Sequence, residues 1–251
     1  MGFGAYARSA GVERLVSRED YEQKHGKGDF DGYWGIWDEP FLQFMGEELS
    51  ATAEPFFATL FTLSSHHPFV VPEQYAATLP AGYTKIHKGV AYDDMAFRRF
   101  FERFGSEEWF RRTIFVFVAD HVSSEKFDPA TREYPGNMHI IGFLYTPDGA
   151  LHGRIAEVSQ QLDIMPTLLG LTGNREPYFA FGRDVLNEPE RPHWSVSYDG
   201  MFRAVTDGGV IAFDEERDAA GSQADSLLSQ FRALVQQYYT RIERKNYTAH
   251  D

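Results

Sequence analysis

The sequence predicts an α/β protein: a mostly parallel central sheet with helices on both faces, followed by a small antiparallel meander and a terminal helix. Three observations predict this class. Dense apolar runs of strand length occur at residues 56–63, 113–119 and 138–145, and they alternate with segments of helical periodicity. Short strand-like segments separated by Asp-Gly turns then follow. A helical pattern ends the chain, as expected for a sheet with an appended meander.

Each helix and each meander strand follows from a local pattern. Apolar residues three and four positions apart predict an amphipathic helix over 38–49, with Asp38 able to cap its start. A second helix has a core-facing stripe formed by Phe97, Phe100, Phe101 and Phe104. Helical periodicity recurs over 159–171, where Asp163 can cap a helix that starts at that point and Pro166 lies in its first turn. The remaining predicted elements are a helix over 225–244 and strands over 194–198, 202–206 and 210–213.

Length and composition exclude several classes of protein. The 251 residues, 43% of them hydrophobic, are enough for a sizeable core. We divide them into residues 1–190, the α/β part, and 191–251, the meander and terminal helix packed on the same domain. The 37 acidic and 24 basic side chains give a net charge of -13, which argues against nucleic acid as a partner. No apolar run is long enough to span a membrane, and no signal peptide is visible.

The absence of cysteine directs the search for a metal site to oxygen and imidazole ligands. Asp120 and His121 directly follow the predicted strand at 113–119. In parallel α/β sheets, functional groups collect at the carboxyl ends of strands. The pair therefore offers one oxygen and one nitrogen ligand for Mn²⁺, Zn²⁺ or Mg²⁺. The alternative from spacing alone is that Asp120 caps the next turn and His121 is an ordinary surface residue.

His66 follows another predicted strand, 56–63, within the polar segment Ser64 to Phe69. A histidine in this position can contact a phosphate or sulfate oxygen or act as an acid or base, because its pKa lies near neutrality. Pro68 restrains the loop to an extended form. The alternative is a polar turn in which neither His66 nor His67 contacts a ligand.

Four motifs occur in a fixed order: TLSSHHPF at residues 62–69, YDDMAF at 92–97, TIFVFVADH at 113–121 and LDIMPTLLGLTG at 162–173, the last followed by FGRD at 181–184. Together they resemble the lipoteichoic acid synthase and phosphoglycerol transferase branch of the sulfatase and alkaline phosphatase superfamily. The resemblance implies an alkaline phosphatase-like α/β sandwich, with residues 1–190 as the C-terminal part of its catalytic domain. It also implies a divalent metal, Mn²⁺ or Mg²⁺ rather than Zn²⁺, at the strand ends.

The resemblance assigns roles to individual residues. Asp120 and His121 match the paired metal ligands of the family, and His66 matches the histidine that contacts the phosphoglycerol group. Tyr92, Asp94, Asp163 and Pro166 match positions that we interpret as structural. In the family a threonine attacks the phosphodiester of a lipid head group and forms a covalent phosphoglycerol enzyme. This chemistry takes place on the extracytoplasmic face of the cell membrane.

The chain also departs from the pattern of the family. The catalytic threonine, an early acidic ligand and the membrane helices of relatives lie upstream of the matched motifs, and the first threonine here is Thr52, in or just after a helix. No catalytic residue is therefore assigned, and we expect this chain alone to be inactive. Val122 replaces a glycine that often follows the Asp-His pair. A sheet without its first strands would leave an open edge and exposed apolar surface, which favours self-association or a partner chain.

Two alternatives remain open at this point. The same fold and metal chemistry serve sulfatases, phosphodiesterases and phosphoethanolamine transferases, and the motif TLSSHHPF favours the phosphoglycerol branch only moderately. A non-catalytic binding or accessory domain derived from such an enzyme is the second alternative. Substrate binding that survives loss of the metal would distinguish that domain from an enzyme.

Overall fold

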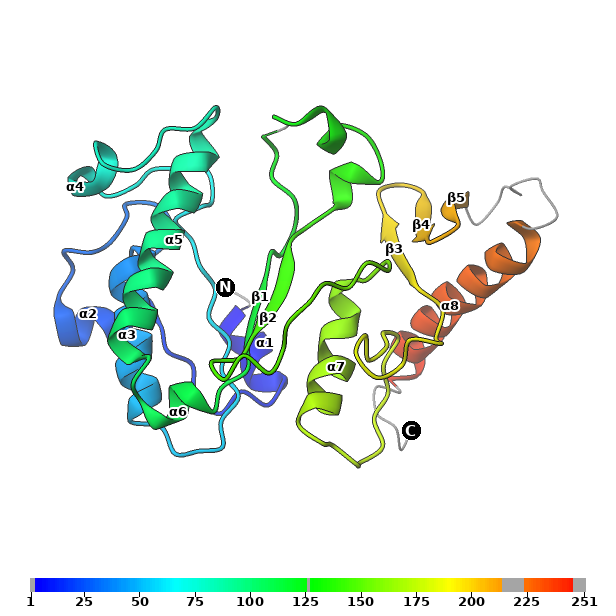
Figure 1. Cartoon of the computed structure of the whole chain (residues 1–251), viewed down its shortest axis with the longest axis horizontal. Helices are drawn as coiled ribbons and strands as arrows, with labels where there is room; N and C mark the ends of the chain where they lie inside the picture. Colours follow the sequence, from blue (N-terminus) through cyan, green and yellow to red (C-terminus); the bar gives the residue numbers. More distant parts are fainter. Residues whose placement is uncertain (1–2, 126, 214–223, 246–251) are drawn as a thin grey trace. The chain divides into compact units, whose positions relative to one another are not determined.

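The computed structural model describes residues 3–125, 127–213 and 224–245 (Figure 1). They divide into two compact units. Unit 1 comprises Met1–Arg132 and Ile140–Leu151, and unit 2 comprises Glu133–His139 and His152–Asp251. Each unit is described by itself, and the predicted division at residue 190 stays a prediction.

Unit 1 has six α-helices, one 3-10 turn and two strands among its described residues. They are α1 (Phe3–Ser9), α2 (Arg18–His25), α3 (Asp38–Ser50), α4 (Glu73–Ala76), α5 (Lys85–Phe104), α6 (Glu108–Arg111), β1 (Phe115–Val118), η1 (Pro129–Thr131) and β2 (Gly142–Tyr145). The helices predicted from the apolar patterns at 38–49 and around Phe97 are therefore present as α3 and α5. The second begins earlier than its stripe, at Lys85.

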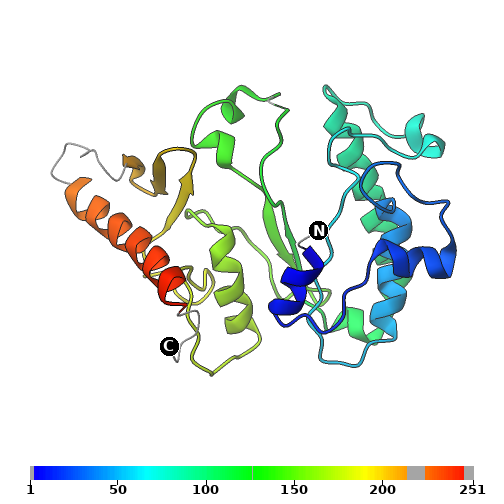
Figure 2. The ribbon, with the colours of Figure 1, turned by 180° about the vertical axis from the view of Figure 1, so that it is seen from behind.

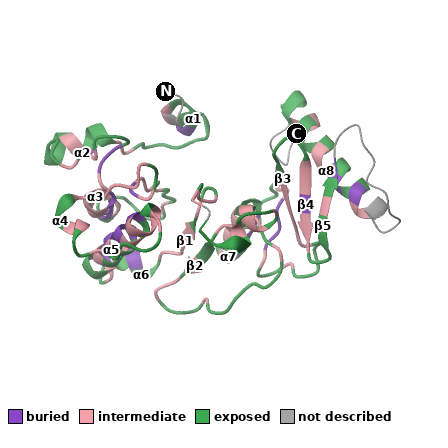
Figure 3. Cartoon of the chain, turned by 90° about the horizontal axis from the view of Figure 1, so that it is seen from above, coloured by how far each residue is buried: buried purple, intermediate pink, exposed green. Residues whose placement is uncertain are grey.

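The core of unit 1 lies between α3, α5 and α6, where Figure 3 shows the buried residues gathering. Leu42 of α3 belongs to one buried cluster with Phe100 and Phe104 of α5 and with Trp109 and Phe110 of α6. The rings of Phe100 and Phe104 are tilted against their neighbours, and those of Trp109 and Phe110 meet edge-on, which avoids face-to-face stacking. The predicted core-facing stripe of α5 is thus confirmed.

Gly46 lets α3 and α5 approach each other closely. A Cβ atom at this position would overlap with the ring of Phe104, which is itself buried. The two helices run side by side in Figures 1 and 2. On their exposed edge, Arg103 of α5 pairs with Glu47 of α3 at 2.7 Å.

Replacing Gly46 by alanine is expected to lower the free energy of unfolding of unit 1 by about 1–3 kcal/mol, because overpacking forces the Phe104 ring aside. The better helix propensity of alanine, about 1 kcal/mol, offsets only part of this cost. Urea titration followed by tryptophan fluorescence measures the change. Gly28→Ala, where an added Cβ has no neighbour within 4 Å, is the matched control. Equal stability of the two variants would contradict this packing.

The predicted parallel central sheet is wrong. Within the described residues the strands form one two-stranded sheet, β1–β2, and one three-stranded sheet, β3–β4–β5. β1 and β2 pair antiparallel, with Phe115 opposite Tyr145 and Val118 opposite Gly142. The physical reason is the connection between them: the described residues of 119–141 form 3-10 turns and no α-helix. A parallel pair needs a crossover connection, usually a helix.

The apolar run at 56–63, predicted as a buried strand, forms no strand in the structure. Phe56 and Leu60 pack against the α3–α5–α6 core. Phe57 and Phe61 point outward and are 86% and 56% exposed. The run is therefore half-buried, and its periodicity of four residues reflects one-sided packing on helices. An apolar run of eight residues cannot by itself show whether a neighbouring strand is present.

Unit 2 contains the predicted meander and terminal helix. Its described elements are η2 (Gly136–Met138), η3 (Gln161–Asp163), α7 (Ile164–Leu171), β3 (Trp194–Tyr198), β4 (Phe202–Thr206), β5 (Gly209–Phe213) and α8 (Ala224–Arg244). β3, β4 and β5 pair antiparallel in chain order. α8 covers this sheet through Leu228 and Phe231, which pack with Ala204 and Phe213. Glycine at 200 and 209 supplies the positive φ angles beside the two turns.

Asp163 ties α7 to the segment that follows it. Its carboxylate accepts hydrogen bonds from the Gln160 backbone N–H at 2.9 Å and the Arg183 backbone N–H at 2.9 Å. Pro166 is fully buried in the first turn of α7. The structural interpretation of Asp163 and Pro166 is confirmed, although Asp163 bridges two segments and does not cap α7 with its side chain.

None of the described helices combines the length and the apolarity needed to cross a bilayer.

Candidate functional site

Asp120 and His121 lie together just beyond the end of β1. The Asp120 carboxylate accepts a hydrogen bond from the His121 backbone N–H at 2.9 Å, and its Oδ2 lies 3.4 Å from His121 Nε2. The His121 Nδ1 lies 2.8 Å from the Val122 carbonyl oxygen. A carbonyl oxygen only accepts, so Nδ1 donates in this contact, and Nε2 is the ring nitrogen left beside the carboxylate.

This arrangement fits two ligands of a divalent cation. Two electron-pair donors, one carboxylate oxygen and one imidazole nitrogen, converge on the same side of the loop, and their side chains are 54% and 68% exposed. Mn²⁺ accepts this mixed donor set, and Mg²⁺ accepts its carboxylate. Among the described residues no group of three or more His, Asp or Glu side chains converges on one point. The pair would therefore need further ligands, such as water or a substrate oxygen.

His66 lies in a separate loop that packs against Trp34. The two ring centroids are 4.6 Å apart with the rings edge to face. The Trp34 indole Nε1 donates a hydrogen bond to the His67 carbonyl oxygen at 2.9 Å, and His66 Nδ1 lies 2.9 Å from the same oxygen. His66 is exposed. The structure thus fixes the ring of His66 at its Nδ1 side and leaves the imidazole accessible to a ligand.

The root of the His66 loop is buried between α3 and α5. The Asp38 carboxylate, at the start of α3, accepts hydrogen bonds from the backbone N–H groups of Leu63 at 2.9 Å and Ser64 at 2.6 Å. In return, the Asp38 backbone N–H donates to the Ser64 hydroxyl at 3.2 Å. On the other side, a Cβ at Gly89 of α5 would come within 3.1 Å of the Ser64 carbonyl oxygen. The loop backbone therefore lies tightly against both helices.

Asp93 of α5 is a second buried carboxyl group at this root. Its side chain hydrogen-bonds to Asp38 and Ser65. Burial, with a smaller contribution from the neighbouring Asp38 charge, raises the pKa of Asp93 from its ordinary value to about 8. Beside it, Tyr92 is fully buried, and its hydroxyl accepts the Glu39 backbone N–H at 3.2 Å. Burial also raises the Tyr92 pKa.

The sequence patterns missed several residues of this loop root. Asp38 was predicted only as a helix cap, and Trp34 and Asp93 were given no role beside the loop. Their partners lie 25 or more residues away, as Asp38 and Leu63 illustrate, so no local spacing indicates them. Tyr92 is buried in α5, as its structural interpretation requires, whereas Asp94 lies in the middle of α5, is exposed and pairs with Arg98 one turn later at 3.1 Å.

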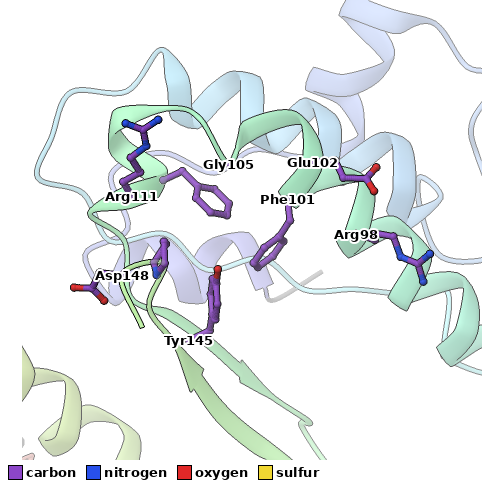
Figure 4. A pocket seen from close by; sticks show the side chains of 9 residues that line it. Arg98, Phe101, Glu102, Gly105, Arg111, Tyr145 and Asp148 are labelled. Atoms are coloured by element: carbon purple, nitrogen blue, oxygen red, sulfur yellow. The ribbon is translucent and has the colours of Figure 1, made fainter. Parts of the chain in front are cut away.

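A hollow of about 610 Å³ lies elsewhere in unit 1, between the end of α5, α6 and the end of β2 (Figure 4). Phe101 and Tyr145 face one another in it, with ring centroids 5.3 Å apart. Tyr145 is paired with Phe115, the first residue of β1. The hollow therefore lies at the opposite end of this sheet from Asp120 and His121, and it does not belong to the candidate site.

The candidate residues lie in two loops, each at the end of an apolar run, and the family of the chain agrees with such a site. The chain belongs to the sulfatase family, whose model matches residues 1–174. It is 25% identical over 212 residues to the lipoteichoic acid synthase-like YvgJ of Bacillus subtilis (strain 168), covering 76% of this chain and 34% of that protein. Over 171 residues it is 26% identical to lipoteichoic acid synthase 1 of the same organism, covering 61% of this chain and 27% of that protein.

A solved structure supports the fold. It belongs to a protein in the alkaline phosphatase superfamily from Vibrio parahaemolyticus and superimposes with a TM-score of 0.73 at 22% sequence identity. The match covers 95% of this chain and 61% of that one. At this identity the likeness shows the fold alone. The chain spans about a third or less of the length of the two curated relatives above. The resemblance to lipoteichoic acid synthases therefore covers only part of those proteins.

Proposed function

We propose that this chain forms part of a metal-dependent, phosphoglycerol transferase-like enzyme that acts on phosphodiester head groups of lipids. Asp120 and His121 are the proposed metal ligands, and His66 is the proposed contact to the phosphoglycerol group. The observation that carries the proposal is the convergence of the Asp120 carboxylate and the His121 Nε2 at the end of β1. It occurs within the residues that match the sulfatase family model. The names of the curated relatives favour the lipoteichoic acid synthase branch over other branches.

The proposed roles follow from the chemistry of the side chains. A divalent metal bound at Asp120 and His121 would supply positive charge to stabilise phosphoryl oxygens and lower the pKa of an attacking hydroxyl. The Asp120 carboxylate offsets part of the charge of the ion, and the Val122 carbonyl holds the His121 ring in the orientation that exposes Nε2. His66 orients the phosphoglycerol group through its accessible ring. The proposed role of this chain is thus to bind the metal and to orient the phosphoglycerol group.

The place of action and the covalent step are also part of this proposal. The relatives are named for the synthesis of lipoteichoic acid, which favours the extracytoplasmic face of the cell membrane as the site of action. A phosphodiester of a lipid head group is the proposed substrate, and a threonine of the whole protein is the proposed nucleophile. Because the net charge of -13 repels anions, attraction to the head group depends on the metal and on the local histidines.

The test uses Mn²⁺ as a paramagnetic probe. Purified chain, Mn²⁺ and glycerol phosphate are mixed, and the relaxation rates of the ligand protons are measured by NMR. We expect protein-dependent enhancement that falls at least about fivefold in Asp120→Ala and His121→Ala, because each loses one of two ligands. It should also fall in His66→Ala, which loses the phosphoglycerol contact. Asp94→Ala and His67→Ala are the matched controls, since each removes an exposed side chain of the same type that is not a proposed ligand contact.

Three outcomes would overturn parts of the proposal. Enhancement unaffected by Asp120→Ala would remove the metal site. Stronger displacement of glycerol phosphate by an aryl sulfate than by a phosphodiester would favour a sulfatase of the same superfamily. Ligand binding that persists after all divalent metal is chelated would favour a non-catalytic binding or accessory domain.

A further inference from the structure

We propose that Asp38 and Asp93 share one proton, and that this protonated carboxyl pair positions the loop of Ser64 to His67, with His66, against α3 and α5. The pair is a positioning device: neither carboxyl group is proposed to touch substrate. Only the last step, that His66 contacts the substrate, rests on the proposed function. The positioning of the loop can be measured without ligand or metal.

The first step of the argument is the role of Asp38 as an acceptor. Its side chain is buried, and both of its oxygens lie within 3.0 Å of the Leu63 N–H, while Oδ2 also takes the Ser64 N–H. Three close donor contacts of this kind favour the ionised form of a carboxylate. Asp38 is therefore the acceptor of the pair, and its hydrogen bonds hold the loop backbone.

The second step is the state of Asp93. It is 8% exposed, and its carboxyl group lies within hydrogen-bonding distance of Asp38. Two carboxylates cannot donate to one another, so a hydrogen bond between them requires a proton. The Asp93 Oδ1 is buried and has no partner among the described residues. An unpaired oxygen costs less on a neutral carboxylic acid than on a carboxylate. Both observations place the proton on Asp93.

The third step is the set of charged and titratable groups that surround the pair. Asp93 receives a hydrogen bond from Ser65 of the loop. The groups nearest to its neighbour Tyr92 are Asp38 and Glu39 of α3 and Tyr75 of α4. Glu39 already pairs with Arg99 of α5, at 3.3 Å. This arginine therefore serves Glu39. Protonation of one carboxyl group relieves the repulsion between Asp38 and Asp93.

The pH dependence follows from the sign of the shift. The pKa of Asp93 is higher in the folded protein than in the unfolded chain, so the stabilising protonated form is complete below about pH 4. Its contribution is lost as the pH rises toward about 8, where a second buried negative charge repels Asp38. Ionisation is expected to release the Leu63 and Ser64 N–H groups and to loosen the loop that carries His66.

The test is hydrogen–deuterium exchange of peptides covering residues 60–68 between pH 5 and pH 9, corrected for the intrinsic pH dependence of exchange. In the wild-type chain we expect the protection of these amides to fall by at least about tenfold over this range. Asp93→Asn, which stays neutral and can still donate to Asp38, should give protection that does not change with pH. Asp94→Asn, one residue along α5 and exposed, should behave like the wild type.

A second measurement covers the case in which Asp93→Asn does not fold. The wild-type chain should show the infrared band of a protonated carboxyl group at pH 6.5, and the band should vanish by pH 9. Absence of the band, flat wild-type protection, or an unchanged pH profile in Asp93→Asn would each overturn the proposal. If loop protection changes with pH as described but His66→Ala leaves glycerol phosphate relaxation unchanged, the positioning stands and the proposed function fails. If His66→Ala lowers the relaxation enhancement of glycerol phosphate but loop protection does not change with pH, the proposed function stands and the positioning fails.

Discussion

Replacing Phe100 by alanine is expected to lower the free energy of unfolding of unit 1 by about 3–5 kcal/mol, the cost of deleting a buried aromatic ring. Phe100 is 5% exposed and contacts the rings of Phe104, Trp109 and Phe110. All three contact residues are large and fixed by one another, so the core cannot collapse into the space. Urea titration followed by tryptophan fluorescence measures the change, because Trp109 lies in the same core.

The matched control for this prediction is Phe57→Ala. It deletes the same side chain from a position that is 86% exposed, so its effect on unfolding should stay within about 0.5 kcal/mol. A loss of stability in Phe57→Ala as large as that in Phe100→Ala would show that the apolar run at 56–63 is covered in solution. A small loss in Phe100→Ala would contradict the packing of α5 against α6.

Replacing Asp38 by alanine is expected to cost about 3 kcal/mol at pH 6. The change leaves the buried N–H groups of Leu63 and Ser64 without an acceptor, at about 1–3 kcal/mol each. Loss of the hydrogen bond with Asp93 adds to this cost. The same urea titration measures it, and Asp94→Ala should change stability by less than about 0.5 kcal/mol, since its ion pair with Arg98 is exposed.

The pH dependence of the Asp38→Ala effect provides a further check. Above pH 8, Asp93 is ionised in the wild type and repels Asp38, so removing Asp38 also removes this repulsion. The cost of the substitution should therefore be smaller at pH 9 than at pH 6. A cost that is equal at both values would show that the two carboxyl groups do not interact.

The helices and the meander of this fold were predictable where the spacing of apolar residues within a segment shows which face is buried. The phenylalanine stripe of α5 and the leucines and Phe231 of α8 repeat with helical spacing, and both helices are present. The turns at Gly200 and Gly209 marked the meander, which forms as predicted. Local chemistry determines these elements, so the sequence contains the information needed to place them.

The sheet topology was not predictable in the same way. The apolar run that became β1 reads equally well as a parallel or an antiparallel strand, because only the partner and the connection distinguish the two. Here the partner is β2, and the part of the connection that the structure describes has no α-helix. The run at 56–63 has the composition of a strand, but it packs on helices through Phe56 and Leu60. Pairing is a property of two segments, and an alternating pattern of elements does not define it.

The candidate site was partly predictable. Adjacent residues such as Asp120 and His121 must lie together, so their proximity followed from the sequence, and the structure adds the orientation of the imidazole. The support of the His66 loop did not follow, because Asp38, Asp93 and Trp34 come from three separate segments. Asp38 and Asp93 are both buried, and burial is decided by the tertiary fold.

The long connection between β1 and β2 has a consequence for the order of folding. Phe115 pairs with Tyr145 across residues 119–141, whereas Tyr198 pairs with Phe202 across a single tight turn. Contacts between distant residues form more slowly, because loop closure must be completed before the contact contributes. The entropic cost itself grows slowly, by about 0.6 kcal/mol for each doubling of loop length. The meander is therefore expected to form early, and the β1–β2 ladder, which sets the position of Asp120 and His121, to form late.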